Sequence, residues 1–241
     1  PYPTLENPNI TILWHTTEET HKENLSGNPD TFDPVWSVKE EFEQKYGGTV
    51  TVLAVPWGDM KSTLISMVST GELCDLAQAN DQNFPIYPVK KLIHPVADIV
   101  DLNNELWYDS VTEAFTFGGE AYAMGADATS ILVYYNKTLL DNYGVKTPEE
   151  YYAEGKWNWD AFRTIGMEMT DDTDGDGVND QFGFGWWDQD YKLFLGSNGL
   201  TDMVYNNDGS ITTSYTSAPG IEALQFIQDA YIKDAYIDRT K

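Results

Sequence analysis

An aspartate-rich loop carries the clearest candidate chemistry in the sequence. Four aspartates occupy positions 1, 3, 5 and 9 of the segment that begins at Asp172, and Gly177 stands at position 6, where the chain must turn sharply. This is the oxygen-ligand spacing of a calcium-binding loop. The expected Ca²⁺ ligands are four carboxylates and one backbone carbonyl: Asp172, Asp174, Asp176, Asp180 and, through its carbonyl, Val178.

The loop departs from a complete EF-hand pattern at one position. Position 12 is Gly183, where the pattern has a bidentate glutamate, so another carboxylate must complete the shell, and Asp171 and Asp188 are nearest. A solvated Asp/Gly turn is the alternative to a metal site. We expect a structural Ca²⁺ ion, because four like charges this close repel one another unless a cation lies among them.

Two groups of large aromatic residues flank this loop, WNWDAF before it and QFGFGWWDQDY after it. Aromatic rings can stack on the apolar C–H faces of sugars, whereas sugar hydroxyls need carboxylates and amides. Trp186 and Trp187 are adjacent, and neighbouring side chains of an extended segment point to opposite sides. One of these rings can therefore lie in a core while the other faces a ligand.

The composition argues against several functional classes. The 241 residues carry 14 basic and 39 acidic side chains, a net charge of −25, and such a surface repels nucleic acids and anionic lipids. Cys74 is the only cysteine, so neither a disulfide framework nor a thiolate metal cluster is expected. No apolar run reaches the roughly 18 residues of a membrane span. Because Pro1 opens the chain, we expect that a targeting segment is missing.

Apolar periodicity predicts an α/β arrangement in the first third of the chain. Strands and helices are expected to alternate, in chain order, at 10–14, 33–47, 49–55, 59–71 and 73–79. The polar residues 20–32 are expected to form a loop. Strands that alternate with helices favour a parallel sheet covered by helices.

The rest of the chain shows further helical stripes and short strand-like runs. Strands are expected at 121–124, 130–135 and 182–185, and helices at 136–143, from 147, from 159 to 169 and at 219–233. On the last helix, we expect one buried face made of Ile221, Leu224, Ile227 and Tyr231.

Five segments in the same order resemble the extracellular solute-binding proteins of ABC importers, in the carbohydrate-binding family that includes maltose-binding protein. They are ITILWHTTEE, TGELCDLAQANDQNF, EAYAMGADATSILVYYNKTLLDNYGV, WNWDAF and GIEALQFIQDAYI. The similarity covers residues 10–238, although Cys74 stands where the family usually has proline.

The resemblance implies a type II periplasmic-binding-protein fold, with two lobes of mainly parallel sheets flanked by helices. Lobe I would comprise residues 1–122, the crossing 123–128 and lobe II 129–241. Family members continue well past this point, so we expect a fragment whose C-terminal part is missing and whose ligand binding is weak or absent.

The resemblance also implies a function. The protein would bind an oligosaccharide between its lobes and deliver it to a membrane permease without catalysis. It would be extracellular and held at the bacterial membrane by a lipid anchor. The implied ligand-binding residues are Trp14, Thr16, Thr17, Glu18, Trp57, Asn80, Asp81, Asp127, Trp186, Trp187, Asp188 and Tyr191.

Two other classes stay open at this point. A secreted glycoside hydrolase would need two carboxylates about 5–10 Å apart across a cleft. A calcium-dependent adhesion module would make the ion essential for partner binding. Catalysis by histidine is not expected, because His15, His21 and His94 lack metal-ligand spacing and an accompanying nucleophile motif.

Overall fold

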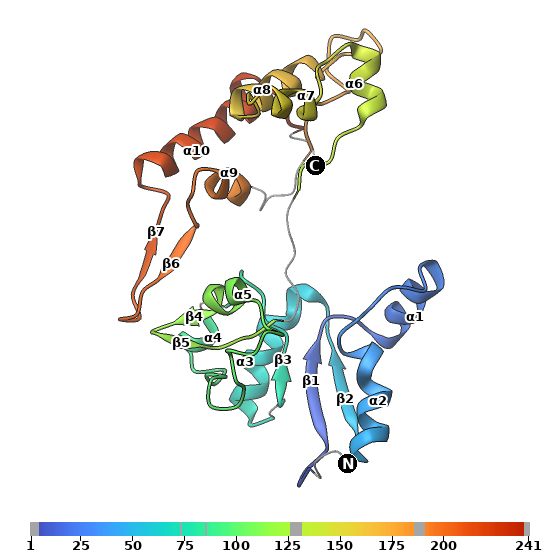
Figure 1. Cartoon of the computed structure of the whole chain (residues 1–241), viewed down its shortest axis with the longest axis vertical. Helices are drawn as coiled ribbons and strands as arrows, with labels where there is room; N and C mark the ends of the chain where they lie inside the picture. Colours follow the sequence, from blue (N-terminus) through green and yellow to red (C-terminus); the bar gives the residue numbers. More distant parts are fainter. Residues whose placement is uncertain (1–4, 73, 85, 126–131, 186–190, 239–241) are drawn as a thin grey trace. The chain divides into compact units, whose positions relative to one another are not determined.

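The computed structural model describes residues 5–72, 74–84, 86–125, 132–185 and 191–238. Contacts within the chain divide it into two units, Pro1–Ala128 (unit 1) and Thr129–Lys241 (unit 2) (Figure 1). Each unit has its own hydrophobic core. The boundaries expected for the lobes and their crossing stay predictions.

A three-stranded parallel sheet forms the centre of unit 1. Its strands are β1 (Ile10–Trp14), β2 (Val50–Ala54) and β3 (Leu76–Ala77). β1 lies in the middle, pairs with β2 along its whole length and with β3 at two positions (Figure 1). The structure therefore confirms the predicted parallel sheet, although the third strand is shorter than predicted.

Helices and one short hairpin complete unit 1. These elements are α1 (Glu18–Gly27), α2 (Trp36–Tyr46), the 3₁₀ turn η1 (Trp57–Asp59), α3 (Met60–Thr70), α4 (Ile86–Val89), α5 (Asp109–Ala114), β4 (Thr116–Phe117) and β5 (Glu120–Ala121). Leu13 from β1 packs with three side chains of α3 and with Tyr87 of α4 in a buried cluster. This core attaches α3 and α4 to the sheet.

The prediction of a loop over residues 20–32 was wrong for most of that segment. Residues 18–27 form α1, whose first backbone donors are capped because the Thr17 side chain accepts a hydrogen bond from Thr20 N (3.1 Å). Lys22 pairs with Glu18 one turn away. A helix held by a cap and an ion pair needs no apolar stripe, which is why hydrophobic periodicity did not reveal it.

Unit 2 is mainly helical in its described part. Its elements are α6 (Lys137–Tyr143), α7 (Pro148–Ala153), α8 (Trp159–Glu168), α9 (Tyr191–Ser197), β6 (Met203–Tyr205), β7 (Ile211–Thr213), α10 (Ala218–Gln228) and the π-helical turn η2 (Asp229–Lys233). Phe162 of α8 joins the parts of the core, with its ring centroid 4.8 Å from that of Phe184 and 5.7 Å from that of Phe194.

In unit 2, two predicted strands were wrong, and the predicted buried face of the last helix was wrong in part. The described residues of 130–135 form no strand, and the run 182–185 contributes only the bridge between Phe184 and Ile237. Of the predicted buried face, Ile227 and Tyr231 pack against the core, but Ile221 and Leu224 of α10 are exposed (56% and 39%), whereas Ala223 is fully buried. The helix therefore turns a neighbouring face to the core, because α9 packs on the side that carries the smaller residue.

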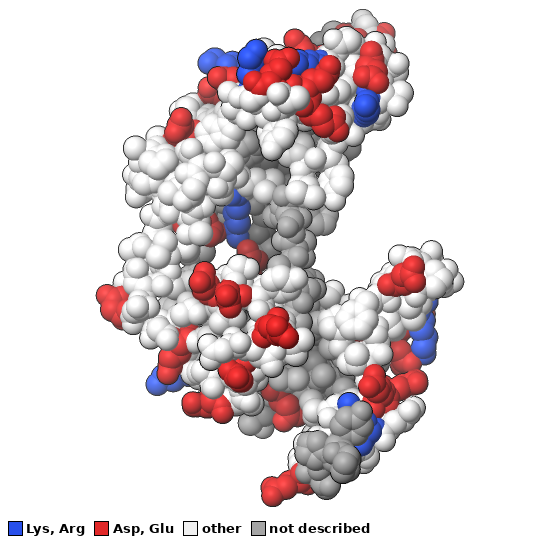
Figure 2. Space-filling model, in the orientation of Figure 1, with Lys and Arg blue, Asp and Glu red and all other residues white. Residues whose placement is uncertain are grey.

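On the visible face, acidic side chains are spread over both units (Figure 2). Within the described residues, no helix combines the length and apolarity needed to cross a bilayer.

Candidate functional site

The carboxyl ends of β1, β2 and β3 bring together several of the predicted ligand residues. Because the three strands are parallel, the segments that follow them start at the same edge of the sheet. Backbone bonds extend this edge beyond the strands: Val55 N donates to Trp14 O (2.9 Å), and Gln78 N donates to Leu13 O (3.0 Å). Such an edge of an α/β sheet is where ligands characteristically bind.

Trp14 is held at this edge by a buried carboxylate. Its indole Nε1 donates to Asp33 Oδ2 (3.1 Å), while Asp33 Oδ1 accepts from Val35 N and Trp36 N (2.9 Å each). Asp33 is only 9% exposed. One carboxylate therefore caps the turn that leads into α2 and fixes the half-buried indole of Trp14.

Replacing Asp33 with alanine should lower the free energy of unfolding of unit 1 by about 2 kcal/mol, because it removes the cap and leaves the Trp14 indole N–H without its acceptor. Urea denaturation followed by tryptophan fluorescence measures this change. The control Asp30→Ala removes an exposed carboxylate three residues earlier. Equal effects of the two changes would show that Asp33 has no such role.

Thr16, Thr17 and Glu18 form hydrogen bonds and an ion pair that stabilise the start of α1 and the chain before it. Trp36 Nε1 donates to the backbone oxygen of Thr16 (2.7 Å), which fixes the chain direction after β1. Thr17 caps α1, and Glu18 lies 2.5 Å from Lys22 Nζ. The hydrogen bond from Lys22 lowers the pKa of Glu18.

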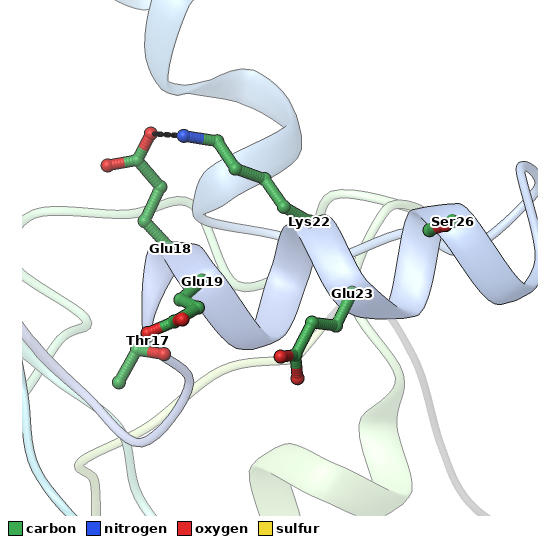
Figure 3. A pocket seen from close by; sticks show the side chains of 6 residues that line it. All are labelled: Thr17, Glu18, Glu19, Lys22, Glu23 and Ser26. Carbon is green, nitrogen blue, oxygen red and sulfur yellow. Dashed lines mark hydrogen bonds and ion pairs between the residues drawn. The ribbon is translucent and has the colours of Figure 1, made fainter.

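A depression lies along α1. Figure 3 shows its lining, with the Glu18 and Lys22 side chains pointing toward each other; the lining residues are Thr17, Glu18, Glu19, Lys22, Glu23 and Ser26. Two of the predicted ligand residues, Thr17 and Glu18, thus have structural roles in α1: Thr17 caps the helix and Glu18 pairs with Lys22.

Asn80 lies just beyond β3 and is buried, with 6% of its surface exposed. Its Oδ1 accepts from Asn83 N (2.9 Å), while its Nδ2 has no hydrogen-bond partner among the described residues. A buried amide donor without an acceptor is unfavourable, so it calls for a ligand atom or water. The neighbouring Asp81 is exposed.

Two residues at the edge were missed by sequence reasoning. His15 was considered only as a metal ligand, yet its ring centroid lies 5.6 Å from that of Trp14 and 5.1 Å from that of Trp57. Gln78 contacts His15 from the adjacent strand end. Trp57, which was predicted, is 42% exposed. The position of His15 directly after a buried strand was the signal that could have identified it.

In unit 2, one predicted ligand residue can be located. Tyr191 begins α9 and accepts a hydrogen bond from Tyr215 Oη (3.2 Å). Burial of the phenol, together with this bond, raises the pKa of Tyr215. The other predicted residues of this half and of the crossing lie outside the described residues: Asp127, Trp186, Trp187 and Asp188.

The aspartate loop brings three of its predicted ligands together. Asp172, Asp174 and Asp176 each place a carboxylate oxygen within 4.8 Å of the other two. Asp172 Oδ2 accepts from Gly177 N (2.7 Å), where the backbone has a φ of 92° that favours glycine. Val178 N donates to Asp176 Oδ1 (2.8 Å) within the same turn.

The remaining carboxylates of the loop have other partners. Asp180 Oδ1 accepts from the backbone and hydroxyl of Thr173, and these bonds lower the pKa of Asp180. Asp171, expected as a possible completing ligand, accepts instead from Tyr143 Oη (3.2 Å) and Asp172 N (3.0 Å). The described group thus comprises three carboxylates, without Asp180.

Comparison with known families settles the class of the protein. Residues 28–238 match the family model of bacterial extracellular solute-binding proteins. The chain belongs to this family.

Solved structures show the same fold for this solute-binding protein. One is an ABC substrate-binding protein of Listeria monocytogenes in complex with cycloalternan (18% identity, TM-score 0.62, 95% of this chain and 54% of that chain). Another is the maltose/maltodextrin-binding domain MalE of Bdellovibrio bacteriovorus bound to maltotriose (19%, 0.60, 95% and 54%). A third is a cyclo/maltodextrin-binding protein complexed with maltotetraose (16%, 0.62, 100% and 56%).

These similarities confirm the predicted fold class, a type II periplasmic-binding-protein fold. The chain spans about half the length of the solved structures it matches.

Proposed function

We propose that this solute-binding protein captures an oligosaccharide for an ABC importer. The observation that carries the proposal is the carboxyl edge of the sheet in unit 1. Trp14, His15 and Trp57 form a connected aromatic group there, and Asn80, just beyond β3, has a buried Nδ2 without a hydrogen-bond partner among the described residues. Rings suit the C–H faces of a sugar, and amide donors suit its oxygens. The solved structures of similar fold include complexes with maltotriose and maltotetraose, which supports the same ligand class.

The role is binding followed by delivery to a membrane permease, without chemical change of the sugar. Support comes from the family, whose members are extracellular solute-binding proteins. A lipid anchor at the bacterial surface belongs to the same proposal, and partition of the complete gene product into a detergent phase tests it.

A thermal-shift panel tests the ligand class. The complete gene product is heated with malto-oligosaccharides, other oligosaccharides, amino acids and short peptides. A solute at a hundred times its Kd stabilises the folded state by about 2.7 kcal/mol. We expect stabilisation by at least one oligosaccharide and by no amino acid or peptide. Stabilisation by peptides alone would contradict the proposal.

We further propose that the aspartate loop holds a structural Ca²⁺ ion. Asp172, Asp174 and Asp176 would be its carboxylate ligands, since oxygen donors this close suit a hard divalent cation. The proposal keeps two further ligands predicted from the loop spacing. The carbonyl of Val178 would bind the ion directly, and Asp180 would bind it through a bridging water, as at position 9 of such loops. The ion would stabilise the loop and take no part in catalysis.

Removal of Ca²⁺ should then lower the unfolding temperature of unit 2. Calorimetric scans with added Ca²⁺ and with a chelator measure the difference, which Asp174→Ala should reduce or abolish by removing one ligand oxygen. The control Asp141→Ala removes an exposed carboxylate on α6 and should keep the response. Identical scans with and without Ca²⁺ would rule out the site.

A further inference from the structure

Both ring nitrogens of His15 have hydrogen-bond partners. Nδ1 lies 2.6 Å from Gln78 Oε1, and Nε2 lies 3.2 Å from Thr16 Oγ1. The three side chains therefore form a continuous row at the carboxyl edge of the sheet, from Gln78 through His15 to Thr16.

The backbone and the neighbouring rings restrict this row, in which His15 is exposed. Gln78 is placed by its N–H bond to Leu13 O, one strand away from the end of β1. The His15 ring contacts two indoles, tilted by 45° to Trp14 and edge-on, at 84°, to Trp57. Its orientation is thus set by packing as well as by hydrogen bonds.

The partners determine where the protons lie. An amide oxygen only accepts, so Nδ1 of His15 must carry the hydrogen that is donated to Gln78 Oε1. The Nε2 of a neutral ring is then an acceptor, and Thr16 must donate its hydroxyl hydrogen to it. With that hydrogen used, Thr16 Oγ1 can only accept from a third group.

We propose that Gln78 is a positioning residue that selects the tautomer of His15 and thereby presents the Thr16 hydroxyl as an acceptor to the bound solute. The inference rests on the proposed function, because Thr16 lies at the same edge. It specifies the ligand chemistry further: the solute group that meets Thr16 is a donor, such as a sugar hydroxyl, and not an ether oxygen.

The tautomer can be measured without any ligand. Long-range ¹H–¹⁵N spectra of the 241-residue chain are recorded at alkaline pH, where an imidazole is neutral, and the His15 signals are assigned by their loss in His15→Gln. We expect the Nδ1–H tautomer in the parent and in Gln78→Glu, which keeps an acceptor oxygen. Gln78→Met should shift His15 toward Nε2–H. The Nε2–H tautomer in the parent, or no shift in Gln78→Met, would overturn the inference.

A double-mutant cycle then tests the consequence for binding. With the complete gene product and the oligosaccharide that stabilises it most, Thr16→Val should weaken binding about threefold to tenfold in the parent. It should have a smaller effect in Gln78→Met, because the Nε2–H of His15 then donates to Thr16 Oγ1 and occupies one of its two acceptor lone pairs. Equal effects in both backgrounds would contradict the inference. If no oligosaccharide binds, the proposed function fails, while the tautomer spectrum still decides the role of Gln78.

Discussion

Replacing Gly183 with alanine is expected to unfold unit 2 under conditions in which unit 1 stays folded. A Cβ atom at this position would lie 1.9 Å from the backbone oxygen of Gly166 in α8, and neither backbone can give way like a flexible side chain. Gly183 N also donates to Thr170 Oγ1 (3.0 Å), so the contact cannot open without breaking this bond. We expect a loss of about 3 kcal/mol or more.

Hydrogen exchange distinguishes the two units in this test. Amides of α8 should lose protection in Gly183→Ala, whereas those of α3 in unit 1 should keep it. The control is Gly185→Ala, because a Cβ at Gly185 meets no atom of the described residues within 4 Å. Wild-type protection of α8 in Gly183→Ala would show that the two segments do not lie in such close contact.

Removing the indole of Trp14 should have the largest effect on ligand binding. In the complete gene product, we expect Trp14→Ala to weaken binding of the preferred oligosaccharide about tenfold to hundredfold, since a fixed aromatic ring loses little entropy when a sugar stacks on it. The bond from Trp14 Nε1 to Asp33 supplies that fixed orientation.

Trp107 offers a matched control in the same unit. It is half-buried like Trp14, and its indole donates to Asp101 O (3.2 Å), but it precedes α5 and does not follow a strand of the parallel sheet. Titration calorimetry of both variants compares the affinities. An unchanged Kd in Trp14→Ala would remove this ring from the binding site.

The sheet of unit 1 could be predicted from the sequence because its strands are short apolar runs separated by amphipathic helices. α1 could not, because Thr17 and the Lys22–Glu18 pair stabilise it through polar contacts. In unit 2, the buried face of the last helix was predicted correctly for Ile227 and Tyr231 but not at the start of α10, where the small Ala223 is fully buried and the larger Ile221 is exposed. Size and hydrophobicity alone do not show which face a neighbouring helix covers.

In the candidate site, too, some features could be predicted from the sequence and others could not. The position of Trp14 at the end of a strand follows from the sequence pattern, whereas its hydrogen bond to Asp33 depends on a turn 19 residues later. The His15–Gln78 contact joins residues 63 positions apart and requires the strand order β2-β1-β3. The loop spacing predicted the group of Asp172, Asp174 and Asp176, but it could not show that Thr173 binds Asp180.

The central claim is that the protein binds a carbohydrate and leaves it unchanged. Calorimetric titration of the complete gene product with oligosaccharides, followed by chromatography of the recovered sugar, tests this directly. We predict saturable heat with a Kd in the micromolar range, about −8 kcal/mol, and an intact sugar afterwards. Cleaved sugar, or no heat with any oligosaccharide while another class of solute binds, would contradict it.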